Sequence, residues 1–330
     1  MLATRVTKML GIKYPIVLAP MALISEPQLV SAVSNAGGLG IFATAFLSAD
    51  EVKSQIKEIK TLTDLPYGVN IPLASANLEE VFDVLVKEDV EIIYTSVGNP
   101  EVLIQKIKDA GMIHMHVVPT SKLARKVEEL GVDIIVAEGG EAGGMLPDNP
   151  VSTMTLVPQV VDAVEAPVIA AGGIADGRGL VAALSLGAEG VLIGTRFIAS
   201  KEAKVHENYK KAIINAKDND TLLIKIGTAS LRVLRNKLLD ETEQKINIFE
   251  QLKFTKIALK EGDIENSIIA MGQSSGLINE IKSVKEIIDD MVLEAENILK
   301  RFANFQKPIH KLRFLNKERK HIFRMFNRLS

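Results

Sequence analysis

The sequence predicts an α/β fold, a (β/α)8 barrel with a helical insertion after the eighth strand and a basic C-terminal tail. Short apolar runs rich in Val and Ile recur eight times before residue 200, and a helical pattern follows most of them. The runs are apolar at consecutive positions, which is typical of strands buried on both faces of a parallel sheet. Eight such units within about 200 residues match the dimensions of a barrel. An open doubly wound sheet is the alternative, because it has the same alternation.

The predicted strands and helices alternate along residues 16–194. The eight strands are expected at Ile16 to Pro20, Leu39 to Ala43, Tyr67 to Leu73, Ile92 to Val97, Ile113 to Val118, Asp133 to Ala137, Pro167 to Ala171 and Gly190 to Gly194. Helical spacing of apolar residues predicts helices at Ala49 to Thr61, Leu78 to Lys87, Glu101 to Ala110, Ser121 to Leu130, Thr155 to Val164 and Gly177 to Leu186. In such a barrel the loops that follow the strands meet at one face, where active sites lie.

The alternation ends after Gly194, and the chain divides into four segments. Residues 1–199 hold the barrel strands and helices with the cofactor site, and residues 200–263 show helical patterns with no strand between them. We expect this second segment to be a helical insertion over the active-site face. Residues 264–300 contain a long amphipathic pattern, which predicts the closing barrel helix, and residues 301–330 form a basic amphipathic tail.

Composition limits the class of protein. An apolar fraction of 47% with a formal net charge of -2 excludes a globally disordered chain. The absence of Cys excludes disulfides, thiolate metal sites and a cysteine nucleophile, and it indicates a cytoplasmic protein. No window is apolar for long enough to span a membrane. Two prolines interrupt the apolar run from Tyr14 to Ile24, so we interpret it as the first strand and not as a signal peptide.

The tail carries most of the charge asymmetry. Residues 301–330 contain nine Lys and Arg against Glu318 alone, which gives +8 and leaves -10 on the other 300 residues. Ile322, Phe326 and Leu329 recur at helical spacing between basic residues, which predicts a basic amphipathic helix. We expect the tail to pack on the acidic body or on a neighbouring subunit of a homodimer. Anionic lipid or nucleic acid is the alternative partner, although nucleic acid is not expected.

Glycines after two of the strands predict a phosphate site. Gly172 and Gly173 follow the seventh strand, and Gly194 and Thr195 follow the eighth. Glycine lets backbone N–H groups approach a ligand, and a following helix N-terminus adds positive dipole. The loops after these two strands are the usual phosphate site of a barrel. Residues 38–43 match a dinucleotide fingerprint as text, but a helix precedes them and a strand contains them, so we reject that match.

The loop after the sixth strand, residues 137–147, holds four glycines within six positions. Such a loop is either the hinge of a lid or the lining of a flat cofactor.

Several motifs occur in a fixed order along the barrel. They are Ala19-Pro20-Met21-Ala22, Gly37-Gly38-Leu39-Gly40, Gly68-Val69-Asn70, Gly98-Asn99-Pro100, the loop of residues 137–147, Ala170 to Gly177, and Gly194-Thr195-Arg196-Phe197. Together they resemble the nitronate monooxygenase family, which includes the flavin-dependent enoyl-ACP reductase, from about Thr7 to Leu299. The stretch from Lys201 to Lys210 is more similar to the enoyl reductase branch.

The resemblance implies a TIM barrel that holds FMN noncovalently. It places the flavin ring near Pro20, Met21 and Asn70, with the phosphate on the amides of Gly172, Gly173, Gly194 and Thr195. The full set of cofactor-binding residues that it implies is Pro20, Met21, Ala22, Asn70, Glu138, Gly139, Gly143, Gly144, Ala171, Gly172, Gly173, Gly194, Thr195 and Gln273.

Met145 departs from the family pattern. The family's catalytic histidine follows Glu-Ala-Gly-Gly, but here residues 141–144 have that sequence and Met145 follows them. A thioether neither accepts nor donates a proton, so position 145 provides no general acid or base. His116 shares a strand face with His114, and it would be a replacement donor if that face is the barrel interior; otherwise both are packed histidines. No metal site is predicted, because the acidic residues lack a histidine partner.

Three functions remain open. FMN-dependent oxidation of alkyl nitronates with O2 is favoured, because a nitronate arrives as an anion and needs no compulsory base. An NAD(P)H-dependent enoyl-ACP reductase is the alternative; it needs a proton, and its partners would be NAD(P)H and acyl carrier protein. The third is a flavin-binding protein that has lost turnover together with its histidine. The first two act on a small-molecule substrate.

Overall fold

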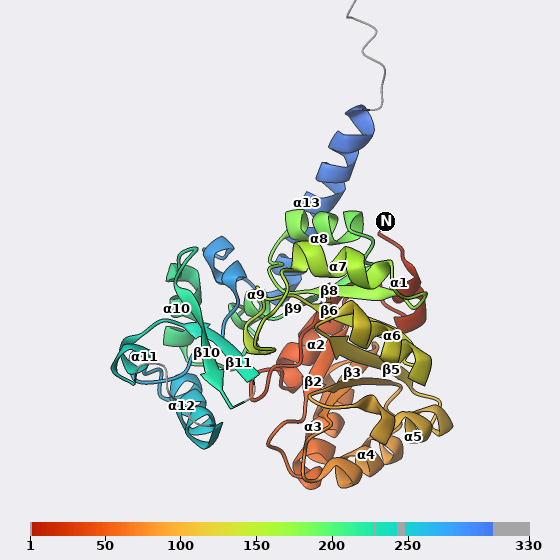
Figure 1. Cartoon of the computed structure of the whole chain (residues 1–330), viewed down its shortest axis with the longest axis horizontal. Helices are drawn as coiled ribbons and strands as arrows, with labels where there is room; N and C mark the ends of the chain where they lie inside the picture. The colour runs from red at the N-terminus through yellow and green to blue at the C-terminus, as the bar shows by residue number, and fades with distance from the viewer. Residues whose placement is uncertain (1, 228, 243–247, 306–330) are drawn as a thin grey trace, which may run out of the picture.

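The computed structural model describes residues 2–227, 229–242 and 248–305, and its centre is a closed parallel barrel (Figure 1). The strands are β1 (Ile16–Leu18), β2 (Gly40–Ala43), β3 (Tyr67–Pro72), β4 (Ile92–Ser96), β5 (Ile113–Val118), β6 (Ile134–Glu138), β8 (Val168–Ala171) and β9 (Gly190–Ile193). They pair in parallel in the order β1-β9-β8-β6-β5-β4-β3-β2. A parallel bridge between Val17 and Leu39 joins the two ends. The predicted barrel is therefore confirmed, and the open sheet is excluded.

Helices cover the outside of the barrel. They are α2 (Pro27–Asn35), α3 (Ala49–Leu62), α4 (Leu78–Lys87), α5 (Ile104–Asp109) after the turn η1 (Pro100–Val102), α6 (Ser121–Leu130), α7 (Thr153–Val161) and α8 (Gly177–Ser185). Several of these helices have a polar N-cap residue. The side chains of Ser48, Thr120 and Asp176 accept hydrogen bonds from backbone N–H groups in the first turns of α3, α6 and α8. Two short helices, α1 (Arg5–Leu10) and α9 (Thr195–Ile198), flank the first and last strands.

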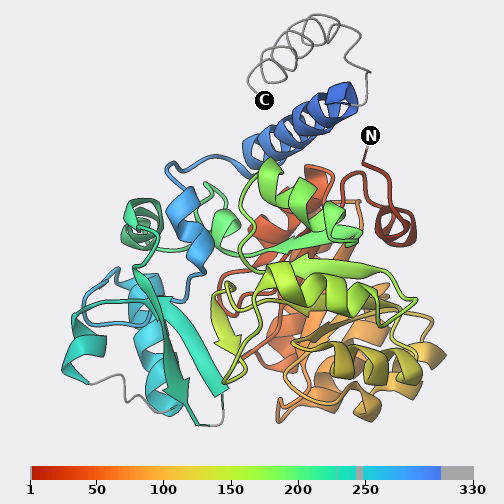
Figure 2. The same cartoon turned by 45° about the horizontal axis from the view of Figure 1, so that its top comes forward.

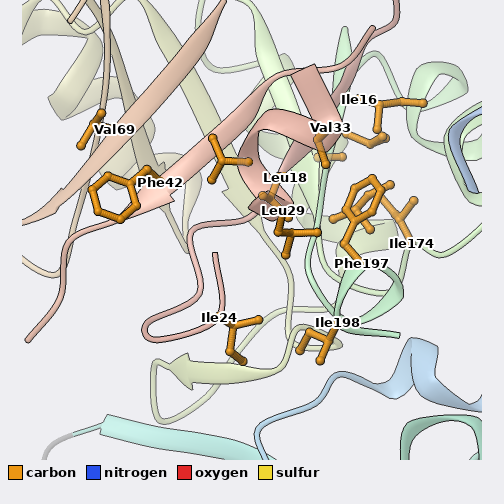
Figure 3. Packing of buried hydrophobic residues seen from close by; sticks show 14 of the residues in the cluster. Ile16, Leu18, Ile24, Leu29, Val33, Phe42, Val69, Ile174, Phe197 and Ile198 are labelled. Carbon is orange, nitrogen blue, oxygen red and sulfur yellow. The ribbon is translucent and has the colours of Figure 1, made fainter. Parts of the chain in front are cut away.

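The barrel has two apolar layers, because successive side chains on a strand point to opposite faces. The inner layer contains Val17, Leu39, Ile41, Tyr94, Met115, Val136, Ile169 and Leu192, together with Val6 and Leu10 of α1. The outer layer fills the space between strands and helices, and Phe42, Phe197 and Leu29 belong to it (Figure 3). Residues that alternate along one strand therefore belong either to the inside or to the helix layer.

The last described helix, α13 (Val284–Phe305), closes the helix ring by packing against α8 and α2. Gly177 allows a close approach, because a Cβ there would lie 2.5 Å from the Met291 carbonyl oxygen. The closing helix was expected within residues 264–300, where the structure has the turn η2 (Gln273–Leu277) followed by α13, which begins at Val284 and continues past residue 300. Figure 2 shows α13 extending beyond the barrel.

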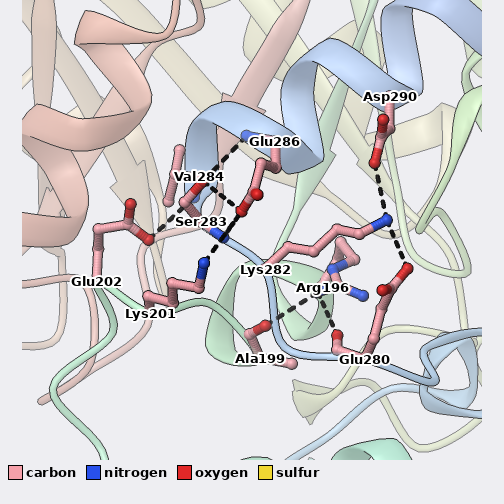
Figure 4. Close-up of polar contacts among 10 residues, drawn as sticks. All are labelled: Arg196, Ala199, Lys201, Glu202, Glu280, Lys282, Ser283, Val284, Glu286 and Asp290. Atoms are coloured by element: carbon pink, nitrogen blue, oxygen red, sulfur yellow. Dashed lines mark hydrogen bonds and ion pairs between the residues drawn. The ribbon is translucent and has the colours of Figure 1, made fainter.

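Polar contacts tie the start of α13 to the segment after β9 (Figure 4). The guanidinium of Arg196 donates through Nη2 to the carbonyl oxygens of Ala199 at 2.9 Å and Glu280 at 2.8 Å. Glu202 accepts from the Val284 amide at 2.9 Å. These contacts hold the start of α13 and the segment before it against the end of the barrel strands.

The insertion is not wholly helical, so the prediction for residues 200–263 is wrong in part. Besides α10 (Glu207–Asn215), α11 (Lys237–Glu241) and α12 (Ile248–Lys260) it contains an antiparallel hairpin of β10 (Thr221–Ile226) and β11 (Ala229–Leu234). One face of the hairpin is buried through Ile224, Ile226, Leu231 and Val233. This alternation is the period-two signal of a strand. The basic tail lies outside the described residues, apart from the end of α13.

Candidate active site

The mouth of the barrel lies at the carboxyl ends of the strands, and the insertion is anchored beside it. Strand β11 pairs antiparallel with β7 (Gly144–Leu146), a short strand in the glycine-rich loop after β6. Met145 lies opposite Leu231 in this sheet. The loop that was expected to be a lid hinge or a cofactor lining is therefore partly a strand, which joins the insertion to the mouth (Figure 1).

A cradle for a phosphate lies after β8 and β9. Gly172 and Gly173 both have left-handed backbone, with φ of +95° and +76°. A Cβ at Gly172 would lie 2.8 Å from the Gly139 carbonyl oxygen, so only glycine fits there. The amide N–H groups of Gly172, Gly173 and Gly194 donate to no acceptor in the part of the chain that the structure describes. Amide N–H groups that have no acceptor, on glycines without a side chain in the way, fit an anionic phosphate.

Close backbone packing joins the loop after β6 to the cradle. A Cβ at Gly139 would lie 2.0 Å from Thr153 Oγ1, and a Cβ at Gly143 would lie 2.5 Å from the Met271 carbonyl carbon. The hydroxyl of Thr195 accepts from the Gly272 amide at 2.9 Å. The neighbouring Gln273 amide donates to the Glu141 carbonyl at 2.9 Å. The predicted residues Gly139, Gly143, Thr195 and Gln273 are thus brought together in one region.

The loop after β1 approaches the cradle from the other side. The Met21 amide donates to Ser25 Oγ at 3.0 Å, and this hydroxyl donates to the Ala19 carbonyl at 2.8 Å, which shapes the loop. A Cβ at Gly194 would lie 3.3 Å from Met21 Sδ. The side chains of Pro20, Met21 and Ala22 are half-buried at this place. This part of the predicted set is therefore next to the proposed phosphate position.

Asn70 at the middle of β3 is buried and oriented by two hydrogen bonds. Its Nδ2 donates to the Tyr94 carbonyl and to Ser96 Oγ, both at 3.0 Å. Its Oδ1 has no partner among the described residues and is free to accept from a ligand N–H. This orientation fits the role near the flavin ring that the resemblance implies.

Glu138 ends β6 on the inner side of the barrel, in alternation with Ile134 and Val136. Its carboxylate forms no hydrogen bond or ion pair with any other described residue. Burial raises the pKa of Glu138 to about 7. At neutral pH this carboxyl therefore carries a proton for about half of the time.

Tyr94 is a site residue that the sequence did not reveal. It lies on the inner face of β4 and is 3% exposed. Burial, together with the charge of Glu138, raises the pKa of its phenol well above the usual value. The signal that could have indicated Tyr94 as a site residue was its position on the inner face of a strand. An aromatic residue at such a position usually belongs to the apolar core.

His116 does not reach the barrel interior, so it does not meet the condition for a replacement proton donor, and the alternative of two packed histidines applies. Met115 occupies the inner layer, so its neighbours His114 and His116 face the helix layer. Thr95 Oγ1 lies 2.7 Å from His114 Nε2 and 2.8 Å from His116 Nδ1. Burial lowers the pKa values of His114 and His116 to about 3 and about 4, which keeps both rings neutral.

Two other expectations concern ligands and membranes. Among the described residues no group of three His, Cys, Asp or Glu side chains could hold a metal ion. Within the same ranges no helix is long and apolar enough to cross a membrane.

Fold and site together define a (β/α)8-barrel enzyme with its site at the carboxyl ends of the strands. The family model described as nitronate monooxygenase matches residues 3–85 and 78–294, and the chain belongs to this family. It is an oxidoreductase, as its relatives are.

Three relatives illustrate the range of the family. One is "(3aS,4S,5R,7aS)-5-hydroxy-7a-methyl-1-oxo-octahydro-1H-indene-4-carboxyl-CoA dehydrogenase" of Rhodococcus jostii strain RHA1, which is 33% identical over 89% of this chain and 96% of its own. A second is a "Probable nitronate monooxygenase" of Staphylococcus saprophyticus, which is 33% identical over 91% of this chain and 99% of its own. The solved structure of FabK from Thermotoga maritima is 40% identical, with a TM-score of 0.86, over 92% of this chain and 99% of FabK.

Proposed function

We propose that this chain is an FMN-dependent oxidoreductase that reduces the α,β double bond of an acyl thioester with NAD(P)H. The observation that carries the proposal is the unpaired Glu138 carboxyl, which lies on the inner side of the barrel mouth with a pKa of about 7. The 40% identity to FabK, the enoyl-ACP reductase branch of the family, supports it.

Reduction of an enoyl thioester requires a hydride at one carbon and a proton at the other. FMN, when bound, supplies hydride chemistry that side chains lack. The thioether of Met145 cannot hold the proton. Glu138 holds one at a carboxyl oxygen near neutral pH, and its lack of a competing partner leaves that proton free to transfer.

The remaining residues would hold and orient the cofactor. The amides of Gly172, Gly173 and Gly194 would donate to the phosphate, and Asn70 Oδ1 would accept from the flavin ring. These roles use hydrogen-bonding groups that have no other partner among the described residues.

Oxidation of alkyl nitronates with O2 is the second candidate, and the lack of an imidazole at the mouth among the described residues favours it. His114 and His116 face the helix layer, and His206 lies in the insertion, where its Nδ1 accepts from the Asn208 amide. His310 and His321 lie outside the described residues. A nitronate arrives as an anion, so it needs no base. A flavin-binding protein without turnover is the outcome if neither substrate reacts.

Anaerobic reduction of the purified flavoprotein tests the proposal. We expect NADH or NADPH to bleach the flavin, and an enoyl thioester to restore its absorbance. Rapid bleaching by an alkyl nitronate, with no response to either nicotinamide, would instead support nitronate oxidation. Bleaching by neither would indicate that turnover has been lost.

A further inference from the structure

Among the described residues, four other than glycine have left-handed backbone, and three of them lie at the barrel mouth. Leu23, Phe46 and Val97 have φ of 63°, 68° and 52° and follow β1, β2 and β4. Asp89, with φ of 50°, lies at the opposite end of the barrel, between α4 and β4. Aspartate tolerates this conformation, whereas a β-branched valine there is an outlier.

Burial of the side chains does not offset this strain. Phe46 is 64% exposed and Val97 is 55% exposed. Packing within the described fold therefore explains neither the strained backbone nor the exposed apolar side chains. Strained residues that persist without a packing reason occur mostly at ligand sites.

The loops after β2, β3 and β4 contact one another and form a continuous rim. Asn77 Nδ2 donates to the Leu47 carbonyl at 2.9 Å, which joins the loop of Phe46 to the loop after β3. The Leu73 amide donates to the Ser96 carbonyl at 2.7 Å, which joins that loop to the loop of Val97. We call residues 46 and 97 the apolar rim; Leu73, whose loop joins theirs, is buried in the outer layer.

The apolar rim is tied to the interior of the site and lies away from the phosphate cradle. Ser96, the residue before Val97, accepts from Asn70 Nδ2 at 3.0 Å. The cradle follows β8 and β9, whereas β2, β3 and β4 lie on the other side of the barrel in the strand order. A ligand that extends from the cradle across the mouth would therefore reach the rim with its far side.

We propose that Phe46 and Val97 bind the apolar chain of the substrate and set the preferred chain length. This inference rests on the proposed function, because the chain belongs to an acyl thioester. The side chains of Phe46 and Val97 are exposed, so they lose contact with water only when the chain covers them. Each methylene that becomes buried favours binding by about fourfold.

The test is a series of butenoyl, octenoyl and dodecenoyl thioesters with three variants. Val97→Gly relieves the backbone strain and removes the side chain, and Phe46→Ala removes the ring. Asp89→Gly is the control, because it also places glycine at a left-handed position but lies on the far face of the barrel. For the wild type and the control, kcat/KM should rise with chain length. Both rim variants should lose about tenfold or more with the dodecenoyl substrate and change little with the butenoyl substrate.

Stability distinguishes binding from a structural role. Val97→Gly should keep or raise the Tm while it lowers kcat/KM for the long chain. If kcat/KM rises with chain length as steeply in both rim variants as in the wild type, the proposal is overturned. If the wild type reduces no thioester, the proposed function has failed. Equilibrium dialysis of saturated butanoyl and dodecanoyl thioesters then still tests the rim, because equal affinity of the two for the wild type would overturn the proposal.

Discussion

The two sides of the barrel mouth use left-handed backbone in different ways. After β8, Gly172 and Gly173 adopt it without steric cost and leave amide N–H groups open. After β2 and β4, Phe46 and Val97 adopt this conformation although it is sterically unfavourable for them, and their large side chains are exposed. The glycine side suits a ligand that touches the backbone, and the other side suits a ligand that touches side chains. The comparison separates cofactor binding from substrate selection.

The change with the widest consequence is Gly173→Val on the cradle side, because every reaction of the site needs the bound cofactor. A β-branched residue at φ of +76° would distort the turn that presents the amides. Loss of one or more charge-assisted hydrogen bonds should weaken FMN binding by about tenfold to a hundredfold. Denaturing release and chromatography would measure FMN content after reconstitution.

Gly111→Val is the matched control for this change. Gly111 also has positive φ, at +66°, but it lies between α5 and β5, with no atom within 4 Å of an added Cβ. It should lose stability through the same strain and still bind FMN normally. Equal flavin loss in both variants would mean that general destabilisation, and not the cradle, is responsible.

The next effect concerns Glu138, which lies between the two sides in the strand order. Glu138→Gln keeps the shape and removes the titratable proton, so turnover of an enoyl thioester should fall by roughly 10² to 10⁴. Flavin content should stay close to that of the wild type. Adding Met145→His to this variant should recover part of the rate, because an imidazole can hold the proton. A full rate in Glu138→Gln would show that the proton comes from another group.

The dependence of kcat/KM on pH should also reflect the ionisation of Glu138. Because the pKa of Glu138 is about 7, the protonated form decreases above that pH, and kcat/KM should fall by about tenfold per unit. The stability of the apoprotein should also decrease as the pH rises. The raised pKa contributes stability that is fully present below the ordinary value of 4.5 and is lost as pH rises through about 7. Melting of the wild type and Glu138→Gln across this range would measure it, and parallel curves would contradict the assignment.

The smallest effect on the mouth is expected from removal of residues 307–330. Every residue assigned to the cradle or the rim precedes them, so flavin content and chain-length preference should not change. If the basic tail packs on the acidic body or on a second subunit, truncation should lower the Tm by a few degrees or reduce the oligomer mass. Salt-sensitive binding of the full chain to anionic vesicles, with unchanged Tm and mass after truncation, would favour the lipid alternative.

Local patterns predicted the barrel well and the insertion poorly. Strand β8 could be placed because a strand buried on both faces is a continuous apolar run. The hairpin of β10 and β11 has apolar side chains at alternate positions, and the polar Ser230 and Arg232 between them are buried as well, so it has no continuous apolar run. The histidines show a second limit. The period of two correctly placed His114 and His116 on one face, but it did not indicate which face is inside.

The sequence by itself determined the eight strands and the glycine positions of the cradle, which depend on residue type and local spacing. Its resemblance to the family implied the loss of a proton donor at Met145. Only the tertiary structure decided that His116 faces the helices, that Glu138 and Tyr94 line the interior, and that Phe46 and Val97 have strained backbone at the mouth. The physical reason is that strand facing, desolvation and backbone strain arise when the barrel closes and distant loops come into contact.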